Sequence, residues 1–139
     1  MIEFHYETDF QLQDESKFAD WLARVVVSEN AHIAQLDYIF CTDAYLLEKN
    51  QQYLNHDTYT DIITFDYSEG RNIAGDVFIS VDRLKENSVK YNVRFDEEIL
   101  RVMAHGALHL LGYKDKSVEE IEVMRKKEEE KIKLFHVEQ

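Results

Sequence analysis

Polar and apolar residues alternate along two stretches of the chain, with the two-residue period of a strand that has one buried face. Ile2, Phe4 and Tyr6 form the first stretch, and residues 34–40 form the second. Residues 62–65 and 73–81 are two further strand-like segments, joined by a loop over residues 68–71. The pattern therefore predicts four strands.

Apolar residues at helical spacing occupy the intervals between and after these strands. The residues expected to cap the N-termini of five helices are Ser16, Thr42, Asp82, Asp96 and Ser117. Gly112 is expected to end the fourth helix, and Ser117 with Glu120 has the spacing of a capping box before the fifth. Four strands and five helices indicate an α+β domain.

The length of 139 residues suits one domain, spanning 1–139. The single cysteine, Cys41, excludes an internal disulfide and any cysteine-based metal cluster, and it fits a reducing cytoplasm. We expect it to be a small buried residue, because no histidine partner for a nucleophile can be assigned. The chain has no apolar run long enough for a transmembrane helix and no signal-peptide pattern, so we expect a cytoplasmic protein without a membrane partner.

The net charge of −12 excludes nucleic-acid binding by bulk attraction. Much of the acid lies in the C-terminal segment, which we interpret as a solvated helix face. Contact with RNA would need a local basic rim, for which the candidates are Arg71, Lys85, Lys90, Arg94, Arg101 and Lys114.

His105 and His109 are four residues apart, so they share one face of the fourth helix, away from its apolar stripe. This spacing presents two imidazoles to one zinc ion, although it also occurs on ordinary solvated helices. Gly112 permits a sharp turn that would return Asp115 toward the histidines, although Asp115 is also explained as part of the turn before the last helix. Gly106 stands where H-E-x-x-H zinc enzymes have a glutamate as general base, so an ordinary thermolysin-type site is excluded.

Three segments match the motifs of one family in the same order. Residues 105–115 read HGALHLLGYKD, which resembles the motif H-G-x-L-H-L-x-G-Y-D-H. Residues 60–65 resemble the motif T-D-V-L-S-F, and residues 75–80 resemble the motif G-D-I-x-I-S. Asn50 falls where the family has an asparagine. These are motifs of YbeY, a family of bacterial rRNA maturation factors and metal-dependent endoribonucleases, which the chain resembles over nearly its whole length.

The resemblance implies a mixed four-stranded sheet with helices, similar to the fold of zinc metalloproteases, and one zinc ion held by His105, His109 and Asp115. It implies cleavage of single-stranded RNA in 16S rRNA 3′-end maturation and ribosome quality control. The implied partners are the small ribosomal subunit, one of its proteins and a ribosome-associated GTPase. In two places the chain departs from the family. Asp115 replaces a histidine, which makes manganese or another divalent metal more plausible, and Leu54 replaces an arginine linked to activity on RNA. Arg71 is a candidate substitute for that arginine in substrate binding.

Two acidic residues near these motifs have two interpretations each. Glu98 lies two turns before His105 and is a candidate general base or acceptor behind a ligand, but a solvated glutamate in the first turn of the helix is the favoured interpretation. Asp76 would either orient a ligand histidine or face solvent. Thr60 and Asp61 would either contact substrate or cap a turn. We expect His5, His32, His56 and His136 to be surface residues without ligand spacing.

The leading hypothesis is thus a metal-dependent endoribonuclease. Two alternatives are a zinc-dependent peptidase, which the absence of a glutamate after His105 disfavours, and a non-catalytic ribosome assembly factor with a structural metal. The latter would fit the acidic charge and the change at Leu54.

Overall fold

The computed structural model describes residues 1–54 and 60–137, except for the side chains of Tyr53 and Leu54. Within these residues the chain forms four strands and five helices. In chain order they are β1 (Ile2–Tyr6), α1 (Glu15–Ser28), β2 (His32–Cys41), α2 (Asp43–Leu54), β3 (Ile62–Asp66), β4 (Asn72–Ser80), α3 (Val81–Lys90), α4 (Phe95–Leu110) and α5 (Val118–His136). The predicted α+β class, with four strands and five helices, is confirmed.

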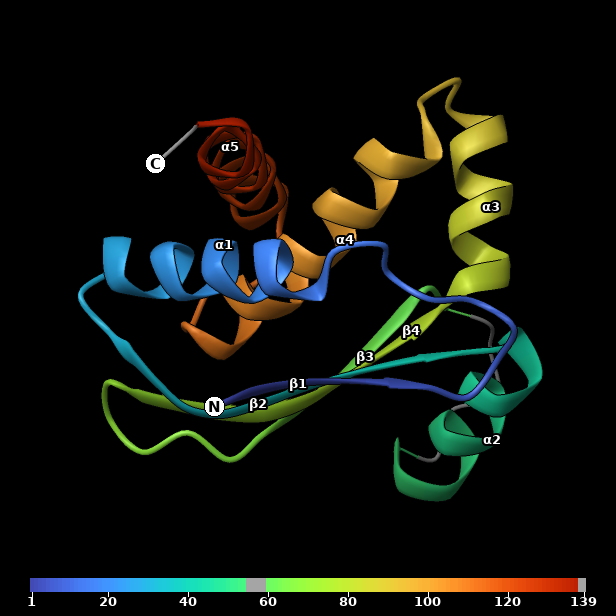
Figure 1. The fold of residues 1–139 in the computed structure, drawn as a ribbon, viewed down its shortest axis with the longest axis horizontal. Coiled ribbons are helices and arrows are strands. Elements are labelled where there is room, and N and C mark those ends of the chain that lie inside the picture. The colour runs from blue at the N-terminus through green and yellow to red at the C-terminus, as the bar shows by residue number, and fades with distance from the viewer. Residues whose placement is uncertain (55–59, 138–139) are drawn as a thin grey trace.

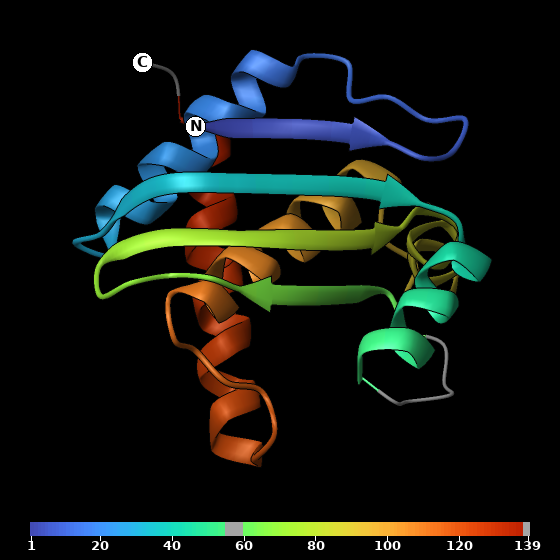
Figure 2. The same ribbon diagram turned by 90° about the horizontal axis from the view of Figure 1, so that it is seen from below.

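The four strands form one mixed sheet in the order β1-β2-β4-β3. β1, β2 and β4 are parallel, and β3 pairs antiparallel with β4 and forms one edge of the sheet (Figure 2). β3 and β4 are joined by a short turn with Gly70 at φ +57°, which is compatible with the predicted loop.

Helices α1 and α4 cover one face of the sheet, and α5 packs across them as an outer layer (Figure 1). The main core lies between these layers, around side chains such as Trp21, Tyr38 and Met103. α2 lies against the other face at one end, over a small cluster of Cys41, Leu46 and Ile63. Cys41 is buried there, as predicted, and burial raises the pKa of its thiol to about 12. No helix in the described part of the chain has the length and apolarity needed to cross a membrane.

Several predicted helix starts are wrong by one or two residues. The cap of α1 is Asp14 rather than Ser16, and the cap of α3 is Ser80 rather than Asp82. α4 has Arg94 at its N-cap with no side-chain bond, although Asp96 was the expected cap. The predicted capping box of Ser117 and Glu120 is confirmed at the start of α5.

Candidate metal site

Helix α4 presents both histidines to one side while its apolar stripe packs on the sheet. Met103, Ala104, Ala107 and Leu108 are fully buried, whereas the side chains of His105 and His109 are 14% and 25% exposed. Gly106 allows this close approach, because a Cβ atom there would lie 2.8 Å from Cγ1 of Val77 in β4. A residue with a side chain at this position would therefore push α4 away from the sheet.

The chain reverses after α4 through a Schellman motif. The N–H of Gly112 donates to the carbonyl of His109, and the N–H of Tyr113 donates to the carbonyl of Leu108, both at 3.0 Å. Gly112 has a φ of +103°, which residues with a Cβ atom rarely adopt. The turn carries Asp115 back over the helix.

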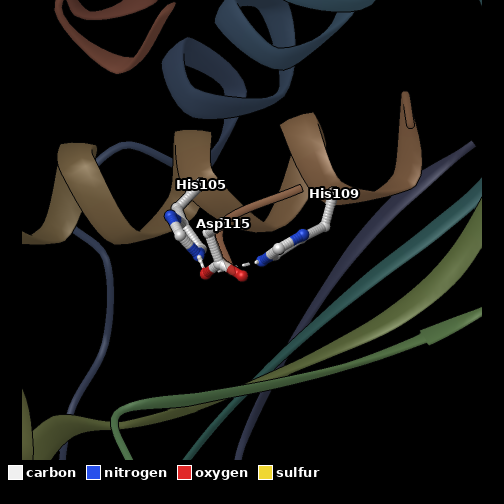
Figure 3. Close-up of side chains that lie close together, drawn as sticks. All are labelled: His105, His109 and Asp115. Atoms are coloured by element: carbon white, nitrogen blue, oxygen red, sulfur yellow. Dashed lines mark ion pairs between the residues drawn. The ribbon is translucent and has the colours of Figure 1, made fainter. Parts of the chain in front are cut away.

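Asp115 reaches both histidines, as Figure 3 shows. Its Oδ2 atom lies 3.1 Å from Nε2 of His105 and 3.3 Å from Nε2 of His109. The structure thus brings together the three residues that the sequence singled out as metal ligands, and their ligand atoms lie within 4.8 Å of one another.

The other ring nitrogen of each histidine has an acceptor. Nδ1 of His109 lies 3.0 Å from the carbonyl oxygen of Tyr113, and Nδ1 of His105 lies 2.6 Å from Oε2 of Glu128. A carbonyl or carboxylate oxygen only accepts, so both Nδ1 atoms carry the proton. The two Nε2 atoms both face the Asp115 carboxylate.

This donor set fits a divalent cation. Two imidazole nitrogens and a carboxylate oxygen converge on one point, and neutral imidazoles would donate their Nε2 lone pairs to a cation held there. Two nitrogen ligands and one oxygen ligand are a combination that zinc accepts in enzymes, and hydrogen bonds to the distal histidine nitrogens are typical of such sites.

A cavity of about 260 Å³ opens beside these ligands. Residues at the start of β3 and on α4 form its wall: Thr60, Asp61, Ile62, Thr64, Arg101 and Val102 complete the lining with the three ligands. A second, larger groove of about 700 Å³ continues from it between α3, α4 and α5. Thr60 and Asp61 therefore lie on the wall of the site itself, and the Oδ2 atom of Asp61 is 3.6 Å from the guanidinium of Arg101.

Glu98 differs from the expectation of a solvated residue, because it is only 3% exposed. Its two carboxylate oxygens accept from Nε and Nη2 of Arg101, at 3.0 and 2.6 Å. It does not line the cavity beside the histidines. The pairing engages both oxygens and disfavours Glu98 as a general base.

Arg71 and Asp76 lie away from the ligands. The Arg71 guanidinium donates to the carbonyl oxygens of Glu29 and Asn30, after the end of α1, and Arg71 lines neither cavity. The interpretation of Arg71 as a substrate-binding residue therefore has no support in its position. Asp76 lies on the central strand β4 and accepts from the Tyr67 hydroxyl, so it does not orient a ligand histidine.

The candidate basic rim reduces to one residue, because Arg101 alone among the six lysines and arginines considered lines the cavity. His5 pairs with Asp37 at 2.9 Å and lies close to Glu3, so it does have carboxylate neighbours, on the sheet face opposite α4. His136 is exposed, with Glu97 3.5 Å away. His56 and the Leu54 side chain lie outside the described residues.

Sequence reasoning missed Glu128, which is 4% exposed although its segment was expected to be a solvated face. The helical spacing of residues in α5 could have predicted that Glu128 is buried. Met124, Glu128 and Lys131 are the buried positions of α5, at spacings of four and three residues.

A further, partly buried network holds the loop that carries Asp115. Glu29 accepts from the hydroxyl of Tyr113, at 2.6 Å, and from the ammonium groups of Lys127 and Lys131. Burial alone would raise the pKa of Glu29, but hydrogen bonds from Lys131, Tyr113 and Lys127 outweigh it and lower this pKa to about 2. The Tyr113 carbonyl, which orients His109, is thus anchored through its own side chain.

An α+β domain with two helical histidines and a returning carboxylate beside an open cavity has the arrangement of a metal-dependent hydrolase site. The family profile described as "Endoribonuclease YbeY" matches residues 2–136. The chain belongs to this family, which confirms the resemblance seen in its motifs.

Individual relatives extend over the same length. A protein named "Endoribonuclease YbeY" from Flavobacterium johnsoniae is 56% identical to this chain, and the alignment covers 100% of each of the two chains. A protein of the same name from Cytophaga hutchinsonii is 47% identical, over 94% of this chain and 92% of the relative. The solution structure of TM1509 from Thermotoga maritima superposes with a TM-score of 0.65 at 26% identity, over 98% of this chain and 92% of that one. The fold and the family therefore agree.

Proposed function

We propose that this protein is a metal-dependent endoribonuclease of single-stranded RNA that acts in ribosomal RNA processing. One divalent ion, with zinc as the first candidate, would be held by His105, His109 and Asp115. The observation that carries the proposal is the convergence of two Nε2 atoms on the Asp115 carboxylate, in a chain of the endoribonuclease YbeY family.

When bound, such an ion lowers the pKa of its water ligand toward about 7 and offsets charge on phosphoryl oxygens. The chain's own residues prepare the site. Glu128 and the Tyr113 carbonyl hold the protons on Nδ1 of the histidines, which leaves the Nε2 atoms to act as ligands. Asp115 brings a negative charge where the family motif has a neutral histidine, so we expect the site to accept manganese more readily than a three-histidine site.

The same proposal includes 16S rRNA 3′-end maturation and ribosome quality control as the process, the cytoplasm as the location, and the small ribosomal subunit, one of its proteins and a ribosome-associated GTPase as partners. Neither alternative is favoured. A peptidase of the thermolysin type needs a glutamate where Gly106 stands, and the family description names an endoribonuclease rather than an assembly factor.

The decisive experiment compares wild type with His109→Ala, purified identically, on a single-stranded fragment of the rRNA 3′ end. Metal content is measured by mass spectrometry on the same samples. We expect His109→Ala to lose metal and cleavage together, whereas His136→Ala, which changes an exposed histidine on α5, keeps both. Equal cleavage by wild type and His109→Ala would refute the proposed site, and cleavage of a peptide library without cleavage of RNA would refute the proposed substrate.

A further inference from the structure

The proposed active site has a single basic side chain on its wall. Arg101 is the only lysine or arginine among the described residues that line the metal cavity, and it also borders the adjoining groove. Its side chain is 37% exposed. An RNA strand brings a negative charge with every phosphate into a protein of net charge −12. The position of this one positive charge therefore bears on where RNA would bind.

Arg101 lies one helical turn before His105 on the same face of α4. Its guanidinium therefore faces the same cavity as the metal ligands. Two of its nitrogens, Nε and Nη2, donate to the buried carboxylate of Glu98. Such a fork fixes the plane of the guanidinium as well as its distance.

The remaining edge of the guanidinium has no equally close partner. Nη1 lies 3.7 Å from Oε1 of Glu128, beyond hydrogen-bond distance, and Asp61 is 3.6 Å from Nη2. In the described part of the chain, Arg101 donates hydrogen bonds to Glu98 alone. The fork also raises the pKa of Arg101 above its usual value, so the group keeps its charge at every working pH.

We propose that Arg101 binds a phosphate oxygen of the RNA that enters the metal cavity, and that Glu98 is the positioning residue that aims it. This inference rests on the proposed endoribonuclease function. The buried Glu98 is then explained, since an unpaired carboxylate at that position would be costly.

The test removes the pair as a unit. The double variant Glu98→Gln/Arg101→Met leaves no buried carboxylate without its partner, and Arg125→Met is the matched control, because Arg125 lines only the outer groove and is exposed. Three quantities are measured: metal content, kcat and KM on the rRNA fragment, and the affinity for a 2′-O-methyl RNA oligonucleotide by fluorescence anisotropy across a salt series.

We expect the double variant to keep its metal while kcat/KM falls about 100-fold, the typical loss when one donor to a developing charge is removed. The slope of log Kd against log salt should decrease by about 0.7, the value for one phosphate contact on a single strand. Arg101→Lys should restore the slope, because it keeps the charge, but restore kcat/KM only in part, because lysine cannot form the fork with Glu98.

Unchanged kcat/KM and an unchanged salt slope in the double variant, with an active wild type, would overturn the role of Arg101 and leave the proposed function standing. A larger loss in Arg125→Met than in the double variant would also overturn it. If the wild type cleaves no RNA, the proposed function fails, and the salt slope alone still decides whether Arg101 binds phosphate.

Discussion

Gly106 is the position where the packing of α4 can be tested most directly. A Cβ atom at residue 106 would lie 2.8 Å from Cγ1 of Val77 and 3.1 Å from Cδ1 of Ile62. Carbon atoms prefer separations of about 3.5–4.0 Å, so Gly106→Ala creates an overlap of roughly 0.7 Å with Val77. Val77 is fully buried on the central strand β4 and β-branched, and it has no free direction in which to move.

Two opposing contributions set how much Gly106→Ala changes the free energy of unfolding. Overpacking a buried site costs about 1–3 kcal/mol, and replacing glycine by alanine inside a helix contributes about 1 kcal/mol of stability. We expect Gly106→Ala to lower the free energy of unfolding by up to about 2 kcal/mol. Because α4 must move away from the sheet, we also expect weaker metal binding at His105 and His109.

Urea unfolding of the metal-free protein isolates the packing term, with the fluorescence of the buried Trp21 as the probe. The matched background is Val77→Ala, which removes both methyl groups that meet the new Cβ atom. In that background Gly106→Ala should be neutral or stabilising. If Gly106→Ala raises the urea midpoint of the otherwise wild-type protein, the argument for close helix-to-sheet contact is wrong.

Three further predictions concern buried charged or reactive groups. Glu128→Gln should weaken metal binding about tenfold in a chelator competition, since it removes the charged acceptor behind His105. The control variant Glu129→Gln changes an exposed neighbour and should leave metal binding unchanged. Equal metal affinities of the wild type and Glu128→Gln would show that His105 is oriented without Glu128. The pKa of Glu29 is lowered to about 2 from an ordinary 4.5, so its ionised form stabilises the fold above about pH 4.5 and this contribution is lost as the pH falls toward 2. Glu29→Gln should therefore cost about 2–3 kcal/mol at pH 7 and almost nothing near pH 2, measured by urea unfolding at both values; a cost that does not depend on pH would exclude this linkage. Burial raises the pKa of the Cys41 thiol to about 12, so a thiol reagent at pH 8 should react only at the rate of unfolding, and fast reaction in the native state would contradict the burial.

The strands were predictable because their apolar positions face one core. The alternation around Phe4 and Tyr38 follows directly from the pleat, and both residues pack on the side that α1 and α4 cover. Helix starts were less predictable, since Asp14 competes with Ser16, and Ser80 with Asp82, for a cap that either residue type can form. That choice depends on where the preceding segment ends rather than on the capping residue itself.

The candidate ligands were predictable because they lie within eleven residues of one another, on one helix and the turn that follows it. Glu128 was not, because its contact with His105 spans 23 positions and depends on how α5 crosses α4. Glu98 and Arg101 are only three residues apart in the sequence. Their pairing was still not predicted, because the sequence does not tell whether that turn of α4 faces solvent or α5. Long-range packing therefore supplied the groups behind the ligands.

The acidity of the whole chain says little about this site, because three of the acidic side chains behind it are engaged by other groups. Glu98 is neutralised by Arg101, Glu128 holds the ring of His105, and Glu29 is bound by two lysines. Asp115 and Asp61 remain on the cavity wall, where a divalent ion at the three ligands would offset their charge. The guanidinium of Arg101 then lies on the wall of the cavity that a phosphate would enter. An acidic protein can in this way bind one short stretch of RNA and still repel the rest of the strand. The salt dependence of its RNA affinity should accordingly correspond to one or two phosphates, rather than to a long electrostatic track.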